Sequence, residues 1–154
     1  MRRSRKKMLE GQVPKLYSDR ITIRVPEFIL QYVEQSVQDS GISRNRWLSD
    51  AVIAFNDIIT FAETPFPLTE NQTNEYLYSL VKRTQLSFLK RDESLPIRFT
   101  ENAEDAANKI AWRYKTQLDE GESLPQNIRG TLLLVILIEH MLRHNTQEKI
   151  SSVA

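Results

Sequence analysis

The stretch from Arg20 to Val25 alternates between polar and apolar side chains, and this alternation constrains the fold more than any other feature of the chain. The apolar positions are Ile21, Ile23 and Val25, and the polar positions are Arg20, Thr22 and Arg24. A period of two is typical of a strand with one buried and one exposed face. Every backbone N–H and C=O group of so short a strand needs a partner. The strand therefore requires a second strand and cannot fold alone.

Two helical patterns follow this strand. Pro26 removes a backbone donor and has a backbone angle suited to a first helical turn, so we expect a helix to begin there. Apolar residues then recur at helical spacing as far as Gly41, a residue suited to a left-handed helix end. Ser43 is positioned to cap a second helix. The apolar stripe of that helix is Trp47, Leu48, Ala51, Val52, Phe55, Ile58 and Ile59.

The same order of elements recurs later in the chain. A second alternating segment consists of Leu95, Pro96, Ile97, Arg98, Phe99 and Thr100. Thr100 is positioned to cap a following helix and Gly121 to end it, and Ser123-Leu-Pro-Gln126 has the pattern of a capping box that opens the last helix. The run Leu132–Ile138 is apolar on all sides, as expected of a helix at the centre of a fold.

A connector separates the two copies. Residues 61–68 include Thr-Pro-Phe-Pro, which interrupts a helix, and Thr69-Glu-Asn-Gln72 is a capping-box sequence for a new helix. The predicted organisation is a basic flexible arm (1–18), a first strand-helix-helix unit (19–60), a connector with one helix (61–93), a second unit (94–145) and a tail (146–154).

The segment Arg20-Ile-Thr-Ile-Arg-Val-Pro26 and the turn Gly41-Ile-Ser-Arg44 resemble the ribbon and the inter-helix turn of the ribbon-helix-helix family of the Arc, MetJ and CopG repressors. In that family two antiparallel strands enter the major groove of DNA and read bases with their outward side chains. Two copies in one chain are similar in layout to the tandem T-DNA border-binding virulence accessory proteins. The resemblance implies a mainly α fold with a small two-stranded antiparallel β-ribbon, a tandem pseudo-dimer, and sequence-specific binding of double-stranded DNA.

The resemblance also assigns roles to residues. Base contacts are expected from the outward strand residues Arg20, Thr22, Arg24, Arg98 and Thr100. Phosphate contacts are expected from Ser43, Arg44 and Ser123 near the starts of the second helices. Arg46 joins them because a cation in a first helical turn is disfavoured unless an anion is bound there. Pro96 lacks a donor, so we expect the second copy to dock more weakly or to serve mainly as a folding partner.

Positive charge is concentrated before and within the first strand. Residues 1–24 hold eight Lys or Arg against two carboxylates, a net charge of +6 in a chain of net charge +1. The first seven residues include Arg2, Arg3, Arg5, Lys6 and Lys7. We expect this arm to add phosphate contacts or to enter a minor groove. The alternative is a charged, solvent-exposed tail that only keeps the protein in solution and binds nothing.

Other classes of function find little support. The absence of Cys excludes a disulfide framework and thiol-ligated metals and fits a reducing cytoplasm. His140 and His144 could share a metal, but no third ligand is evident, so we expect exposed histidines near a helix end. No arrangement of residues indicates an enzyme or a cofactor. The run Leu132–Ile138 is far shorter than the roughly 20 residues that span a bilayer, which predicts a soluble cytoplasmic protein without membrane contact.

Two further interpretations stay open. Residues 20–59 could form the ribbon once per subunit of a homodimer, with residues 69–144 as a helical sensor or partner-binding domain. Alternatively, the chain is a helical protein-interaction adaptor whose basic arm binds acidic surfaces. If the chain binds DNA, the sequence is compatible with transcriptional repression and with DNA processing in plasmid partition or conjugation. It is also compatible with self-association on adjacent DNA sites and with a protein partner that binds the helical face.

Overall fold

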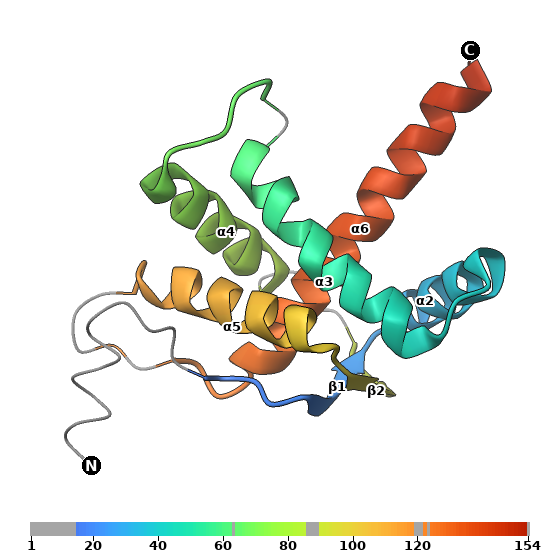
Figure 1. Ribbon diagram of the computed structural model, residues 1–154, viewed down its shortest axis with the longest axis horizontal. Coiled ribbons are helices and arrows are strands. Elements are labelled where there is room, and N and C mark those ends of the chain that lie inside the picture. Colours follow the sequence, from blue (N-terminus) through green and yellow to red (C-terminus); the bar gives the residue numbers. More distant parts are fainter. Residues whose placement is uncertain (1–14, 63, 86–89, 119–121, 123, 154) are drawn as a thin grey trace.

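A computed structural model of the chain describes residues 15–62, 64–85, 90–118, 122 and 124–153; for residues 85 and 146–153 it describes the backbone alone. Its elements are β1 (Arg20–Val25), α2 (Glu27–Ser40), α3 (Arg44–Phe61), α4 (Glu70–Gln85), β2 (Glu93–Arg98), α5 (Glu101–Lys115) and α6 (Ile128–Val153). The strands form one antiparallel sheet at the lower edge of Figure 1, and the helices lie above it. The expected fold class, mainly α with a small two-stranded antiparallel ribbon, is confirmed for these residues.

The β1–β2 ribbon is formed within one chain by strands far apart in the sequence. Its register runs from the pair Arg20–Arg98 at one end to the pair Val25–Glu93 at the other. The buried inward side chains are Ile23, Val25, Leu95 and Ile97. β2 ends at Arg98, two residues before the predicted segment ends, because Thr100 becomes the N-cap of α5.

Three helix ends follow the local sequence signals. Gly41 has a φ of +74° directly after the last residue of α2. Ser43 caps α3, since its hydroxyl accepts a hydrogen bond from the N–H of Arg46 at 3.2 Å. Thr69 and Gln72 form a reciprocal capping box before α4, with distances of 2.9 and 3.2 Å. These ends lie where the sequence predicts them.

The central part of α6 forms the middle of the core. Residues 131–137 are all buried, as predicted for a helix enclosed on every side. The connector helix α4 adds Leu77, Leu80 and Val81 to the same core and packs against α3, α5 and α6. It is therefore part of the hydrophobic core as well as a connector between the two predicted units. None of the described helices combines the length and the hydrophobicity needed to cross a membrane.

Helix α6 differs from the prediction at both ends. It begins at Ile128 and not within residues 123–126, and the N–H of Ile128 donates to the carbonyl of Pro125 at 3.2 Å in a turn that precedes the helix. Helix α5 ends at Lys115 with Thr116 as its C-cap, six residues before Gly121, so the expectation that it continues to Gly121 is wrong. Gly121 and Ser123 themselves lie outside the described residues. At its other end α6 continues to Val153 through the predicted tail, and this part extends away from the other helices in Figure 1.

Candidate nucleic-acid interface

The outward face of the ribbon carries arginines and no carboxylate. Its exposed residues are Arg20, Thr22, Arg24, Ser94, Pro96 and Arg98. Arg20 and Arg98 face each other in the register, and like charges directly opposite each other destabilise a strand pair. Neither guanidinium makes a hydrogen bond or an ion pair with any residue that the structure describes. The ribbon thus presents two adjacent cations that lack an internal counterion.

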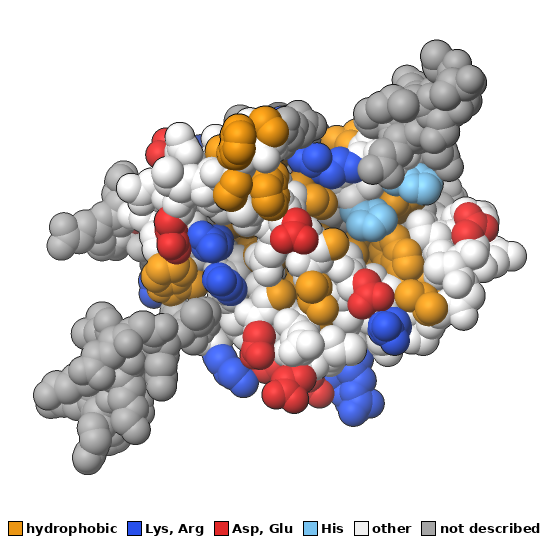
Figure 2. Space-filling model, turned by 45° about the horizontal axis from the view of Figure 1, so that its top comes forward, with side chains coloured by type: hydrophobic (Ala, Val, Ile, Leu, Met, Phe, Trp, Pro, Cys, Tyr) orange, Lys and Arg blue, Asp and Glu red, His pale blue; other side chains and the backbone are white. Residues whose placement is uncertain are grey.

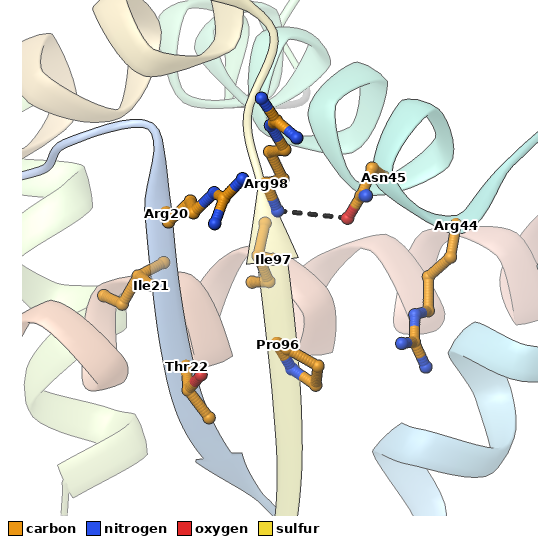
Figure 3. Close-up of a pocket in the computed structure, with 8 residues that line it drawn as sticks. All are labelled: Arg20, Ile21, Thr22, Arg44, Asn45, Pro96, Ile97 and Arg98. Atoms are coloured by element: carbon orange, nitrogen blue, oxygen red, sulfur yellow. Dashed lines mark hydrogen bonds between the residues drawn. The ribbon is translucent and has the colours of Figure 1, made fainter.

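A first groove lies between the ribbon and the start of α3 (Figure 3). It has a volume of about 580 Å³ and is lined by Arg20, Ile21, Thr22, Arg44, Asn45, Pro96, Ile97 and Arg98. Arg44 is the first residue of α3, where the helix dipole disfavours a cation by about 0.3 to 1 kcal/mol. An anion in the groove would turn this unfavourable placement into a favourable one, because backbone N–H groups and guanidiniums would converge on it.

A second groove lies on the other side of β1, next to the start of α6. It has a volume of about 620 Å³ and is lined by Arg20, Ile21, Thr22, Ile23, Arg24, Arg91, Asn127, Arg129 and Gly130. Arg91 precedes β2 and donates to the buried hydroxyl of Thr131 at 3.1 Å, which fixes its position against α6. Partial burial lowers the pKa of Arg91, but an arginine remains protonated in proteins. Sequence reasoning missed Arg91, Asn127 and Arg129 because they flank the ribbon only after α6 has docked.

Arg24 differs from the other two outward arginines. Its Nη1 donates to the hydroxyl of Ser94 at 2.8 Å, and its Nη2 donates to the backbone carbonyl of Asp92 at 3.0 Å. These bonds hold the guanidinium across the ribbon. A guanidinium has five N–H donors, so three remain available to a ligand.

The predicted phosphate-contacting residues at the start of α3 are placed differently from one another. Arg44 lines the first groove, whereas Arg46 lines neither groove and pairs with Asp50 of the same helix at 3.4 Å. The hydroxyl of Ser43 is engaged in the helix cap. Among these three residues, Arg44 is the one that the fold brings beside the ribbon.

The remaining predicted contact residues lie beyond the ribbon or outside the described residues. Thr100 is exposed, but its hydroxyl accepts the N–H of Ala103 at 3.3 Å as the cap of α5. The residues outside the described part are Ser123, Arg2, Arg3, Arg5, Lys6 and Lys7.

Two side chains of α3 accept backbone N–H groups at the end of β2 and just after it. The Oδ1 of Asn45 accepts the N–H of Arg98, and the hydroxyl of Ser49 accepts the N–H of Thr100, both at 3.0 Å (Figure 3 shows the first). Positions four apart lie on one face of a helix, so both reach the same strand edge. These two bonds tie the end of β2 and the residues after it to the first turns of α3. The sequence offers no local signal for these contacts.

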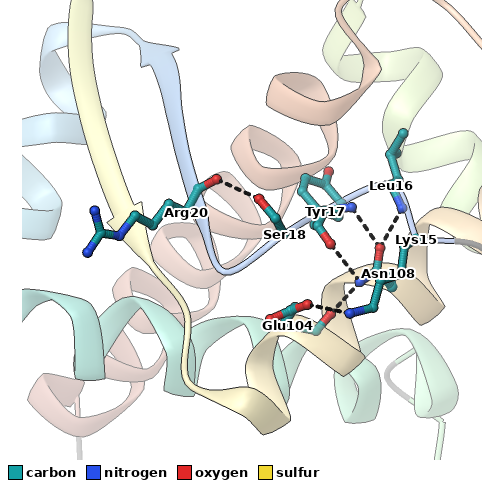
Figure 4. A network of polar contacts seen from close by, with 7 residues as sticks. All are labelled: Lys15, Leu16, Tyr17, Ser18, Arg20, Glu104 and Asn108. Atoms are coloured by element: carbon teal, nitrogen blue, oxygen red, sulfur yellow. Dashed lines mark hydrogen bonds and ion pairs between the residues drawn. The ribbon is translucent and has the colours of Figure 1, made fainter.

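The chain that leads into β1 is anchored, and this corrects part of the predicted arm. Asn108 of α5 is buried, and its Oδ1 accepts the N–H groups of Leu16 and Tyr17 at 2.7 and 2.8 Å (Figure 4). The hydroxyl of Tyr17, whose pKa is raised by burial, donates to the carbonyl of Arg129 at 2.7 Å. Residues 15–18 therefore belong to the fold, because Tyr17 is a core residue, while the preceding residues of the arm lie outside the described part.

His144 is exposed as predicted, whereas His140 is not, and α6 continues past both histidines to Val153. His140 is half-buried within α6, and its Nδ1 lies 2.6 Å from the hydroxyl of Tyr32, while its ring packs against Trp47 at 4.9 Å. Figure 2 shows both histidines, in pale blue, beside hydrophobic side chains. Burial lowers the pKa of His140, and the nearby His144 adds to this effect. The described residues contain no group of three or more His, Cys, Asp or Glu that could hold a metal ion.

The ribbon and its two grooves form one continuous surface, hereafter the ribbon surface, because Arg20, Ile21 and Thr22 line both grooves. Its arginines come from β1, β2, α3, α6 and the segment before β2, and no carboxylate lines either groove. Comparisons of the chain with models of protein families, with curated proteins and with solved structures found no match.

Proposed function

We propose that this chain is a sequence-specific, double-stranded-DNA-binding protein that inserts the β1–β2 ribbon into the major groove, in the manner of the ribbon-helix-helix family that its sequence resembles. The observation that carries the proposal is the ribbon surface, where outward arginines lie between two grooves without a carboxylate. The major groove of B-DNA, about 12 Å wide, admits a two-stranded ribbon. The protein acts by binding and not as an enzyme.

A single chain supplies both halves of the binding unit in this proposal. The first residues of α2 and α5, Glu27 and Glu101, are 74 positions apart, and so are Thr22 and Pro96, which face each other in the ribbon. When a two-fold axis relates two strands, the residue at the axis lies opposite the equivalent residue of the other strand. In addition, α3 contacts β2 while α6 contacts β1, which is the exchange that a two-fold axis requires. These observations favour a tandem pseudo-dimer over a homodimer built from residues 20–59 alone.

The outward residues and the groove residues have different roles. Arg20 and Arg98, and Arg24 with its remaining donors, read base edges from within the major groove. Arg44 on one side and Arg91 with Arg129 on the other bind the phosphates that border it. A bidentate arginine contact to guanine discriminates by about 1 to 3 kcal/mol, whereas a phosphate contact changes the salt dependence of binding with a slope of about 0.9.

The test is selection of bound duplexes from a random pool, followed by titrations of the selected and of a random duplex at several salt concentrations. Arg20→Ala and Arg98→Ala should weaken binding of the selected duplex by about 1 to 3 kcal/mol and that of the random duplex much less. Arg44→Ala and Arg129→Ala should weaken both alike and flatten the salt slope. Lys109→Ala, an exposed cation of α5 away from both grooves, is the matched control.

Failure of the selection to enrich any duplex would contradict the proposal and favour the protein-interaction adaptor. Equal loss of selected and random binding in Arg20→Ala and Arg98→Ala would show that the ribbon does not read bases. Selection from the native flanking DNA then addresses the biological role, because a site at a promoter indicates repression and a site at a partition locus or a transfer origin indicates DNA processing.

A further inference from the structure

The two ends of the ribbon differ in chemistry. At one end Arg20 faces Arg98, and neither guanidinium has a partner among the described residues. At the other end Arg24 faces Ser94, and the serine hydroxyl together with the Asp92 carbonyl holds the guanidinium in place. One end therefore offers two guanidiniums whose N–H donors make no bond to the described residues. The other end offers one guanidinium, and two of its N–H donors already make hydrogen bonds.

The two residues that face each other at the centre of the ribbon also differ in chemistry. Thr22 lies opposite Pro96, the pair through which the two-fold axis of a true homodimer would pass. A threonine hydroxyl both donates and accepts hydrogen bonds, whereas a proline ring offers only apolar contact. The central base pairs thus meet a polar group from one strand and an apolar group from the other.

The two grooves beside the ribbon also differ in the residues that line them. The groove beside α3 receives Arg44 and Asn45, and the groove beside α6 receives Arg91, Asn127 and Arg129. The second side therefore brings one more cation toward the phosphates. Arg91 precedes β2 and is fixed on α6 by Thr131, so this extra cation comes from the segment that joins the two copies.

We infer that the protein recognises a non-palindromic duplex and binds it in one orientation, an inference that rests on the proposed function. Each base pair presents a distinct pattern of donors and acceptors in the major groove, so unequal ribbon ends require unequal half-sites. The end with Arg20 and Arg98 selects two guanine contacts, and the end with Arg24 selects one. Inverting one half of the site should lower affinity about tenfold or more, since at least one bidentate contact is lost.

The orientation can be measured because the chain contains no cysteine. Ile42→Cys, at an exposed position before α3, and Gln126→Cys, at an exposed position before α6, each accept an iron chelate that cleaves nearby DNA. The full chain carrying one label is bound to the selected duplex, and the cleaved positions are mapped. The expected result is cleavage on one flank by the first label and on the opposite flank by the second.

A palindromic selected site, or equal cleavage of both flanks by each label, would overturn the inference while leaving DNA binding intact. Failure to select any duplex would overturn the proposed function and the inference together. Ser94→Arg combined with Pro96→Thr provides a further check, because both strands then carry Arg, Thr and Arg outward. This variant should bind a palindrome of the half-site that the Arg20–Arg98 end selects at least tenfold better, relative to the natural site, than the parent does; no change in that preference would also overturn the inference.

Discussion

His140 shows how packing alters the behaviour of a single residue. The Tyr32 hydroxyl lies against its Nδ1 and the Trp47 ring packs beside it at a tilt, so side chains of α2 and α3 cover part of the imidazole. The neutral ring is favoured, since burial and the neighbouring His144 both lower the pKa of His140 below its ordinary value of 6.5. The folded state therefore binds fewer protons here than the unfolded state does when the pH is acidic.

We predict a loss of stability at acid pH that depends on His140. Because the folded pKa is the lower one, the stability is fully present above pH 6.5 and is lost as pH falls from there through the folded pKa. At pH 5.5 the loss reaches at most about 1.4 kcal/mol. Urea unfolding of the parent and of His140→Gln at pH 7.5 and 5.5 measures it, and the variant should show the smaller decrease.

The control is His144→Gln, which changes the exposed histidine and should retain most of the pH dependence. If His140→Gln and the parent lose the same free energy between the two pH values, the buried histidine is not the titrating group, and the Tyr32–Trp47 packing does not hold it neutral.

The turn between α2 and α3 depends on a single backbone conformation. Gly41 has a φ of +74°, and an added Cβ would meet nothing within 4 Å. The free-energy cost of a side chain at this position therefore comes from the backbone conformation and not from a steric clash. We predict that Gly41→Ala lowers the free energy of unfolding by about 1 kcal/mol, as measured by urea or thermal unfolding.

Gly130→Ala is the matched control for this element. Gly130 lies in the first turn of α6 without a positive φ, and an added Cβ would be 3.9 Å from Ile23, an ordinary contact. Alanine favours a helix over glycine by up to about 1 kcal/mol, so this variant should be neutral or more stable. If Gly41→Ala unfolds with the same free energy as the parent, the left-handed conformation does not require glycine at this position, and the prediction is wrong.

Contacts between the elements before the 64–67 loop and the elements after it hold the described part of the molecule together. β1 pairs only with β2 in the described part of the chain, and α3 packs on α5 as well as on α6. The loop from 64 to 67, which joins α3 to α4, is exposed and takes no part in these contacts. Cutting this loop leaves the contacts between these two sets of elements in place.

We therefore predict that the intact protein is a monomer of 18.0 kDa and that cleavage at a protease site in the 64–67 loop leaves the two pieces associated. Light scattering before and after cleavage checks both points. Residues 1–64 expressed alone should remain unfolded, because β1 then lacks its partner strand. A fragment that instead folds and binds DNA as a dimer would rule out the pseudo-dimer.

The local features of this fold are the part that sequence reasoning predicted well. The alternation of Arg20–Val25, the left-handed end at Gly41, the cap at Ser43 and the capping box at Thr69 all depend on residues within a few positions of one another. Their geometry is decided by backbone angles and short-range hydrogen bonds, which the local sequence contains. The central run of α6 was predicted to be buried because it has no polar face.

Tertiary structure alone decided which of these elements meet and which polar groups line the ribbon surface. Asn45, Arg91 and Asn108 look like ordinary surface residues in the sequence, and only docking brings them to Arg98, the second groove and Tyr17. Their roles depend on partners more than 35 residues away, and no periodic pattern encodes such a pairing. The sequence by itself thus determined the strands, the end of α2, the starts of α3, α4 and α5, and the arginines of β1. Packing decided how these arginines are flanked, paired or left without a partner among the described residues.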